Sequence, residues 1–151
     1  PIISVNHPDD DNLWLGCENG ISVFDGTCWK NYTHKDGLPK TKYRWIERDN
    51  KENIWASDNK IMLKLDADKW ISFFEEESKD ELWFITKKYI DKKGNMWIGV
   101  NANGLYRFDG DEIKHFTEGN GLADNQVLNV FEDHEGNIWF LTTMGASVYH
   151  Y

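Results

Sequence analysis

One short phrase recurs four times in the sequence at a nearly constant interval. The phrase is asparagine, an apolar residue and tryptophan, and it occurs at Asn12 to Trp14, Asn53 to Trp55, Asn95 to Trp97 and Asn137 to Trp139. Successive asparagines are 41, 42 and 42 residues apart. A constant period of this length indicates an array of equal supersecondary units, in which each unit buries its hydrophobic face against the next.

Turn residues divide each repeat into four short segments. The pairs that mark the turns are Asn19-Gly20, Asp25-Gly26, Gly94-Asn95, Asn103-Gly104, Asp109-Gly110 and Gly136-Asn137. Asparagine and glycine tolerate a positive φ and are typical of tight hairpins. In the first repeat, the segments between turns predict strands at about 2–6, 13–17, 21–25 and 29–33. Four antiparallel strands every ~42 residues are typical of a β-propeller blade.

We therefore predict an all-β fold built from β-propeller blades of four antiparallel strands. The blades are expected at about 1–41, 42–82, 83–124 and 125–151 of a single propeller fragment, and the last blade is incomplete. This gives about 15 strands, or about 3.75 blades of a partial propeller. An open arc of blades would expose strand edges and apolar faces. We therefore expect either a fragment of a larger propeller or a homo-oligomer in which two arcs complete the ring.

Charge and hydropathy argue against two classes of partner. The sequence has 26 acidic and 17 basic residues, a net charge of −9, and no Lys/Arg cluster along the chain that would pair with phosphates. Nucleic acid and anionic lipid surfaces are therefore not expected partners. The longest apolar stretches, such as Leu82 to Ile85, are far shorter than the ~20 residues that span a bilayer, so no direct membrane insertion is expected. The chain begins at Pro1 without a signal segment, which indicates a mature product or a piece of a longer protein.

The repeated residues are interpreted as structural. Trp14, Trp55, Trp97 and Trp139 each lie near the start of an inner strand, where a tryptophan can bury ~150–250 Å² between neighbouring blades. Asn12, Asn53, Asn95 and Asn137 mark the turn before each of these strands. Asp49, Asp91 and Asp133 stand four residues before the last three asparagines, so their carboxylates are expected to accept hydrogen bonds from turn amides. Pro8 takes this place in the first repeat.

Cys17 and Cys28 are the two cysteines of the sequence, and both are expected to be free thiols. The first ends a predicted second strand and the other begins the fourth, so their Cα atoms should lie roughly 15 Å apart. A disulfide requires Cα atoms within about 7 Å of each other.

Propeller ligands commonly bind on the face where the loops between second and third strands meet the loops between blades. The polar and aromatic residues expected on that face are Asn19, Asp36, Tyr43, Asp58, Asn59, Asn103, Asn120, Asp124 and Asn125. Several of them also suit tight turns, which is the alternative explanation for their presence. Together they predict an amide-rich rim for a ligand that carries hydroxyl groups.

Four stretches give the sequence a resemblance to a known family. They are Asp36 to Pro39, Asn95 to Gly99, Gly104 to Asp109 and Glu132 to Trp139. They resemble the two-component regulator propeller repeats in the sensor regions of bacterial hybrid histidine kinases, especially those that govern polysaccharide use in Bacteroides-type gut bacteria. The resemblance covers essentially the whole chain. It implies a periplasmic or extracellular domain, part of a ring of about seven blades, that detects a ligand and signals to a kinase elsewhere in the full protein.

The resemblance implies that the chain is a non-catalytic, ligand-sensing segment. Its expected ligands are glycan-derived, such as oligosaccharides, and no cofactor or metal is expected. The acidic runs Asp9 to Asp11 and Glu75 to Glu77 lack the alternating spacing of a calcium loop, so they are interpreted as solvated loop charge. The sequence names neither the ligand nor the downstream signalling partner.

Two alternatives stay open. Gly136 to Phe140 shares a phrase with streptogramin-lyase-like propeller enzymes, although the residues that follow differ. The five histidines show no paired spacing and no nucleophile context. The second alternative is a protein-interaction or assembly module, since an arc with an open edge could accept strands from another chain.

Overall fold

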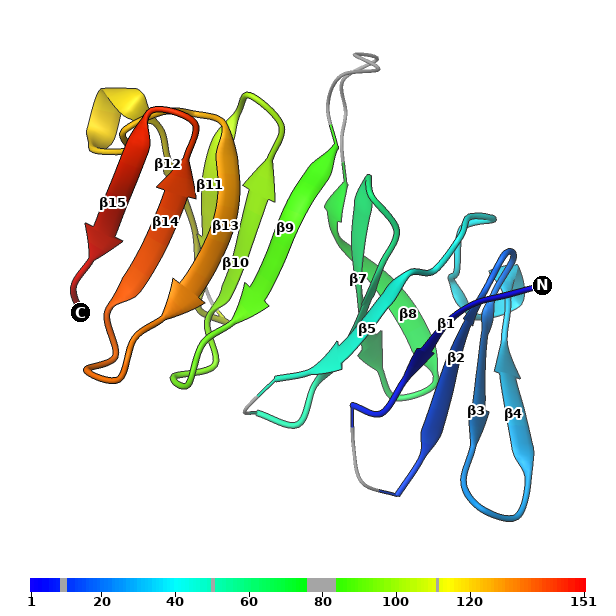
Figure 1. Ribbon diagram of the computed structural model, residues 1–151. Helices are drawn as coiled ribbons and strands as arrows, with labels where there is room; N and C mark the ends of the chain where they lie inside the picture. The colour runs from blue at the N-terminus through cyan, green and yellow to red at the C-terminus, as the bar shows by residue number, and fades with distance from the viewer. Residues whose placement is uncertain (9–10, 50, 76–83, 111) are drawn as a thin grey trace. The chain divides into compact units, whose positions relative to one another are not determined.

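The computed structural model is built from short β-strands and two single-turn 3₁₀ helices (Figure 1). It describes residues 1–8, 11–49, 51–75, 84–110 and 112–151. The strands of the first half are β1 (Ile2–Asn6), β2 (Leu13–Cys17), β3 (Ile21–Phe24), β4 (Trp29–Tyr32), β5 (Trp45–Arg48), β6 (Ile54–Ser57), β7 (Ile61–Asp66) and β8 (Lys69–Glu75). Those of the second half are β9 (Ile85–Ile90), β10 (Met96–Val100), β11 (Gly104–Phe108), β12 (Ile113–Phe116), β13 (Val127–Glu132), β14 (Ile138–Thr142) and β15 (Gly145–Tyr149). The helices are η1 (His34–Asp36) and η2 (Glu118–Asn120).

The described strands form four antiparallel sheets in which neighbours follow chain order. The sheets are β1–β4, β5–β8, β9–β12 and the three-stranded β13–β15. The 15 strands of the described residues confirm the all-β, partial-propeller prediction. β1 and β2 have the predicted bounds, and β3 and β4 each end one residue earlier. The predicted blade limits at 41/42 and 124/125 fall between strands, and the limit at 82/83 lies outside the described residues. All three stay predictions.

The chain divides into two compact units, Pro1–Glu76 and Glu77–Tyr151. Each unit contains two consecutive sheets. In the first unit β1 and β2 contact β5, and in the second β9 and β10 contact β13. Adjacent blades of a unit therefore pack through their innermost strands, as in a propeller.

Aromatic residues fill the space between the two blades of each unit. In the first unit the ring of Trp14 stacks on Tyr32 with centroids 6.4 Å apart and meets the edge of Trp70 at 6.5 Å. In the second unit Trp97 is fully buried, with its ring 5.1 Å from Phe140 and 5.4 Å from Tyr149.

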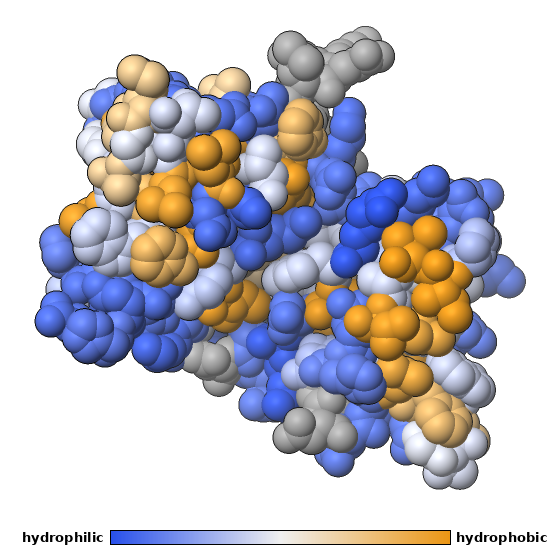
Figure 2. Space-filling view, in the orientation of Figure 1, coloured by the Kyte–Doolittle hydropathy of each residue, from blue (hydrophilic) through white to orange (hydrophobic). Residues whose placement is uncertain are grey.

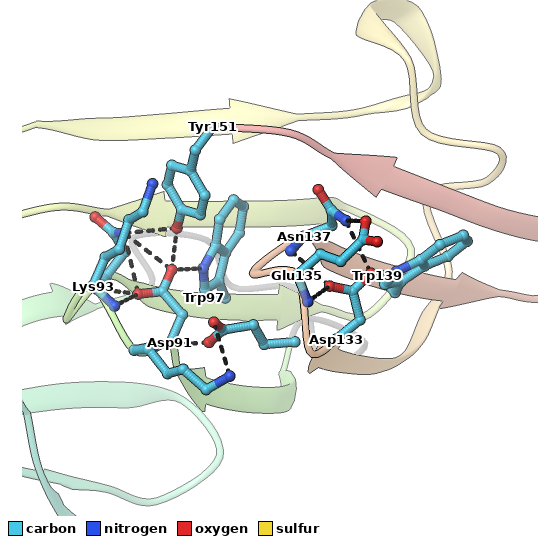
Figure 3. Close-up of polar contacts among 11 residues, drawn as sticks. Asp91, Lys93, Trp97, Asp133, Glu135, Asn137, Trp139 and Tyr151 are labelled. Atoms are coloured by element: carbon cyan, nitrogen blue, oxygen red, sulfur yellow. Dashed lines mark hydrogen bonds and ion pairs between the residues drawn. The ribbon is translucent and has the colours of Figure 1, made fainter.

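An aspartate locks the turn between the first and second strands of a blade (Figure 3). Asp91 accepts hydrogen bonds from the backbone N of Lys93 at 3.0 Å and of Asn95 at 2.8 Å, and its Oδ2 accepts from Trp97 Nε1 at 2.8 Å. Asp133 makes the same set of bonds and accepts from Trp139 Nε1 at 2.8 Å. These contacts confirm the predicted role in the turn. They also add the indole as a donor, which the sequence analysis did not predict.

Asp49 forms the equivalent lock in the first unit, with Trp55 Nε1 donating to its Oδ2 at 2.9 Å. Burial alone would raise the pKa of Asp49 and of Asp91, but the hydrogen bonds that each carboxylate accepts outweigh it and lower the pKa. Both aspartates are therefore held as carboxylates in the folded protein. Cys17 and Cys28 are free, as predicted.

Candidate functional site

Three segments of the first unit meet around a polar pocket. They are the β2–β3 turn, the chain that leads into β5, and the β6–β7 turn. The pocket is open to solvent and has a volume of about 470 Å³, which is within the range of small-molecule sites. Its lining residues are Glu18, Asn19, Lys40, Thr41, Lys42, Arg44, Asp58, Asn59 and Lys60.

Tyr43 fixes the chain that leads into β5. Its side chain is fully buried, and its hydroxyl donates to the carbonyl oxygen of Pro39 at 2.7 Å. Burial also raises the pKa of the Tyr43 phenol, so the hydroxyl stays protonated as a donor. The neighbours on either side, Lys42 and Arg44, are exposed and line the pocket.

Backbone contacts hold Tyr43 against the first blade. Its backbone N donates to the carbonyl oxygen of Cys17 at 3.1 Å, and its own carbonyl oxygen accepts from Ser4 Oγ at 2.9 Å. Gly16 permits this close approach, because a Cβ atom there would lie 2.1 Å from the Tyr43 carbonyl oxygen. The main chain beneath the pocket is therefore fixed by the first blade.

Asp58 shapes the β6–β7 turn from the other side of the pocket. Its Oδ1 accepts from the backbone N of Lys60 at 2.6 Å and of Ile61 at 2.9 Å. Its Oδ2 accepts from the hydroxyl of Thr41, which ties the turn to the chain that leads into β5. The carboxylate of Asp58 is thus occupied by the protein.

The pocket brings together three of the nine predicted ligand-binding residues, Asn19, Asp58 and Asn59. Tyr43 does not lie on the rim, because its position faces the core and its ring is buried. Asp36 closes a capping box with Thr33 around η1 and forms an ion pair of 3.5 Å with Lys69. Its carboxylate therefore stabilises a turn.

The remaining four predicted residues lie in the second unit and are engaged locally. Asn103 Nδ2 donates to the hydroxyl of Tyr106 at 3.0 Å. Asn120 completes a capping box around η2, where its Oδ1 accepts from the backbone N of Thr117 at 2.6 Å.

Asp124 and Asn125 form the rest of this loop. Asp124 Oδ1 accepts from the backbone N of Gln126 at 3.0 Å, and Asn125 Oδ1 accepts from the backbone N of Glu118 at 3.0 Å. These contacts match the turn-forming alternative stated above.

Sequence reasoning missed the basic residues of the pocket. Lys40, Lys42 and Arg44 lie within five residues of the chain, whereas Lys60 comes from a second segment beyond β5 and β6. Folding places all four around one opening. The signal that could have found them is the pairing of two loops that the propeller topology brings to the same end of a blade pair.

Neither a cluster of metal-ligating side chains nor a membrane-spanning helix is found among the described residues. No three His, Cys, Asp or Glu side chains among them are grouped so that they could hold a metal ion. Most of the two acidic runs, Asp9–Asp10 and Glu76–Glu77, lies outside the part of the chain that the structure describes. The helices that the structure describes, η1 and η2, have three residues each and cannot span a membrane.

Three solved structures share the fold at low identity. The extracellular domain of a protein from B. thetaiotaomicron, described as a hybrid two component system, is 24% identical with a TM-score of 0.70, over 98% of this chain and 20% of that one. A catalytically inactive virginiamycin B lyase from Staphylococcus aureus, solved with quinupristin, is 16% identical with a TM-score of 0.64, over 99% of this chain and 55% of that one. PorZ, a surface component of the type-IX secretion system of Porphyromonas gingivalis, is 18% identical with a TM-score of 0.61, over 98% of this chain and 24% of that one. The chain thus spans a fifth of the first of these proteins and about half of the lyase.

The family comparison identifies the repeat itself. No curated protein matches the chain. Residues 121–144 match the family of two component regulator propellers. The matched segment contains β13 and β14 with the turn that Asp133 locks. Asp91 and Asp49 lock the same turn one and two repeats earlier. Over residues 121–144 the chain is therefore similar to the repeat of the two component regulator propeller family.

Proposed function

We propose that this chain is a ligand-sensing segment of an extracytoplasmic β-propeller in a bacterial two-component sensor. The observation that carries the proposal is the family match at residues 121–144. The fold shared with the B. thetaiotaomicron extracellular domain supports a periplasmic or extracellular location. In this proposal the chain detects the ligand, and a kinase elsewhere in the full protein receives the signal.

Glycan-derived ligands fit the first unit best. Its pocket presents the side-chain amides of Asn19 and Asn59. Such groups donate to and accept from the hydroxyl groups of a saccharide. The pocket volume of about 470 Å³ suits a short oligosaccharide rather than a single ion.

A thermal-shift panel of neutral and acidic oligosaccharides tests the proposal. A ligand that binds only the folded chain stabilises it, by about 2.7 kcal/mol at one hundred times its dissociation constant. At least one member of the panel is expected to raise the melting temperature in a concentration-dependent manner. If no oligosaccharide shifts the melting temperature at millimolar concentration, the sensing proposal for this chain is wrong.

The lyase alternative rests on the fold shared with virginiamycin B lyase. The segment that suggested it, Gly136 to Phe140, has a structural role in the blade, because the Trp139 indole donates a hydrogen bond to Asp133 and Phe140 is buried. We propose that the chain is not an enzyme. Incubation with quinupristin should leave the compound unchanged, and its conversion by the chain would revive the lyase alternative.

The assembly alternative is favoured by exposed hydrophobic side chains. In the first sheet Val5 is 61% exposed, and Figure 2 shows a hydrophobic area over β1 and β2. In the last sheet Phe131, Leu141 and Val148 are exposed beside the half-buried Trp139. Light scattering over a dilution series separates the cases. A concentration-dependent dimer would support a homo-oligomer that completes a ring, and a constant monomer mass would contradict it.

A further inference from the structure

The pocket of the first unit differs in charge from the chain that forms it. Four of its lining residues are cationic and two are carboxylates, a local excess of two positive charges in a chain whose net charge is −9. Lys42 lies 3.8 Å from the carboxylate of Glu18. Lys40, Arg44 and Lys60 have no ion-pair or hydrogen-bond partner for their side chains among the described residues.

The two carboxylates do not neutralise these three cations directly. Asp58 accepts two backbone amides and the hydroxyl of Thr41, and Glu18 lies beside Lys42. Lys40, Arg44 and Lys60 are therefore available to an anion from solution. The guanidinium of Arg44 can bind a carboxylate or a sulfate through two parallel hydrogen bonds.

The lining also lacks the groups that neutral sugars use. None of its nine residues is aromatic or aliphatic. The apolar face of a neutral sugar ring needs such a surface to gain affinity from burial. Recognition at this pocket must therefore come from charge and hydrogen bonds.

The second unit provides an internal comparison. Two repeats later in the chain, the positions of Lys40, Lys42, Arg44 and Lys60 are occupied by Asp124, Gln126, Leu128 and Met144. Two residues of the surrounding loops are the same in both units, since Asn19 aligns with Asn103 and Leu38 with Leu122. The fold of a blade pair therefore does not require the four cations.

We propose that this pocket binds a saccharide that carries an anionic group, either a carboxylate or a sulfate. Lys40, Arg44 and Lys60 bind the anionic group, and Asn19 and Asn59 hydrogen-bond to the ring hydroxyls. The inference rests on the proposed sensing function and adds to it the location of the site and the chemical class of the ligand.

Calorimetric titration with matched probes tests the inference. The probes are a galacturonate trimer, a sulfated galactose disaccharide, neutral galactose oligosaccharides of the same lengths, and inorganic sulfate alone. We expect an acidic probe to bind about tenfold or more tightly than its neutral counterpart, with an affinity that falls as salt increases. Comparison of the first two probes tells a carboxylate ligand from a sulfate ligand.

A double variant locates the site. Arg44→Gln with Lys60→Gln removes two pocket charges and should weaken binding of the acidic probe about tenfold. The matched control, Lys35→Gln with Lys114→Gln, removes two exposed charges outside the pocket and should leave the affinity unchanged. Unchanged melting temperatures would show that both variants are folded.

The outcomes separate this inference from the proposed function. Equal binding of neutral and acidic probes overturns the anionic class and leaves sensing intact. Acidic binding that Arg44→Gln with Lys60→Gln does not weaken overturns the location. If inorganic sulfate binds as tightly as the sulfated disaccharide, the proposal that the ligand is a saccharide is wrong. If no saccharide binds, the sensing proposal is contradicted as well.

Discussion

Within each of the two units, one loop connects a blade to the next, and these two loops begin alike and end differently. Residues 33–38 and 117–122 both form a capping box around a single 3₁₀ turn, followed by a glycine in the left-handed region and a buried leucine. Beyond the leucine, the loop of the first unit contains three basic residues before β5, whereas residues 123–126 of the second contain none.

The difference shows which positions the fold controls. Tyr43 and Val127 occupy the same position in their repeats, at the end of the loop or the start of the strand that follows, and both are buried. The residues that flank them are exposed or half-buried, and they are cationic in the first unit and polar or apolar in the second. The buried positions hold the loop against the blade, so the exposed ones are free to determine what the loop binds.

The largest expected effect on stability distinguishes Gly37 from Gly121, which occupy the same position in the two loops. A Cβ atom at Gly37 would lie 2.2 Å from the carbonyl oxygen of Trp70, whereas one at Gly121 would meet nothing within 4 Å. Both have a positive φ, of 91° and 117°. Gly37→Ala should therefore cost about 3 kcal/mol or more, and Gly121→Ala about 1 kcal/mol from the backbone alone. Urea denaturation measures both, and equal losses would contradict the difference in packing.

The aspartate turns should behave alike in the two units. Asp49→Asn and Asp91→Asn each replace a carboxylate that accepts an indole and backbone amides, at an expected cost of about 2 kcal/mol. Asp91 also accepts from the hydroxyl of Tyr151, so its loss should be at least as large. Urea denaturation of the two variants measures the loss of unfolding free energy. An Asp91→Asn variant as stable as the original chain would show that this turn does not depend on the carboxylate.

Acid should weaken the same turns. The pKa values of Asp49 and Asp91 are lowered in the fold, while an unfolded aspartate titrates near 3.9. The stability that they provide is therefore complete above about pH 4 and is lost as the pH falls through the folded pKa values. Denaturation from pH 6 to pH 2.5 should show this decline, and Asp91→Asn should make it shallower. A decline of the same steepness in the variant would be evidence against the assignment.

A smaller effect on stability is expected at Tyr43, the buried residue that differs between the two units. Tyr43→Phe removes the hydrogen bond to Pro39 and should cost about 1 kcal/mol. Val127 has no hydroxyl, so the second unit contains no counterpart. Thermal unfolding of the variant measures the cost, and a loss above about 3 kcal/mol would mean that the ring itself has moved.

The smallest effect on stability should follow exchange of the exposed positions. Lys40→Asp, Lys42→Gln, Arg44→Leu and Lys60→Met together give the first unit the residues of the second. Because the four side chains have at most one exposed ion pair, we expect a change of about 1 kcal/mol or less. Binding of an acidic saccharide should be lost at the same time. A variant that fails to fold would show that these positions are structural.

The repeat predicted the fold because its period and its turns are local signals. Asn19-Gly20 and Asp25-Gly26 mark strand ends directly, and β1 to β4 lie where those turns place them. Asp91 could be assigned to a turn from its spacing. Its hydrogen bond to Trp97, however, depends on the turn and strand geometry that brings the indole back to an aspartate six residues earlier. Aspartate six residues before tryptophan, in three repeats, was the available signal.

The candidate site was less predictable, because it depends on which side of an irregular segment faces the core. Tyr43 was expected on the rim, but its backbone is held by hydrogen bonds with the Ser4 hydroxyl and the Cys17 carbonyl oxygen, which no local pattern encodes. Lys60 joins the cations beside Tyr43 only because the β6–β7 turn approaches them. Long-range contacts of this kind determine the site.

The most direct test of the account is a map of backbone amide NMR shifts during titration with the galacturonate trimer and the sulfated disaccharide. The account predicts that one of these ligands changes the amide chemical shifts of residues 18–19, 40–44 and 58–60. The amide chemical shifts of residues 102–103 and 123–128 should stay unchanged. Shifts centred on the second unit, or spread over both, would contradict a site built by the loops of the first.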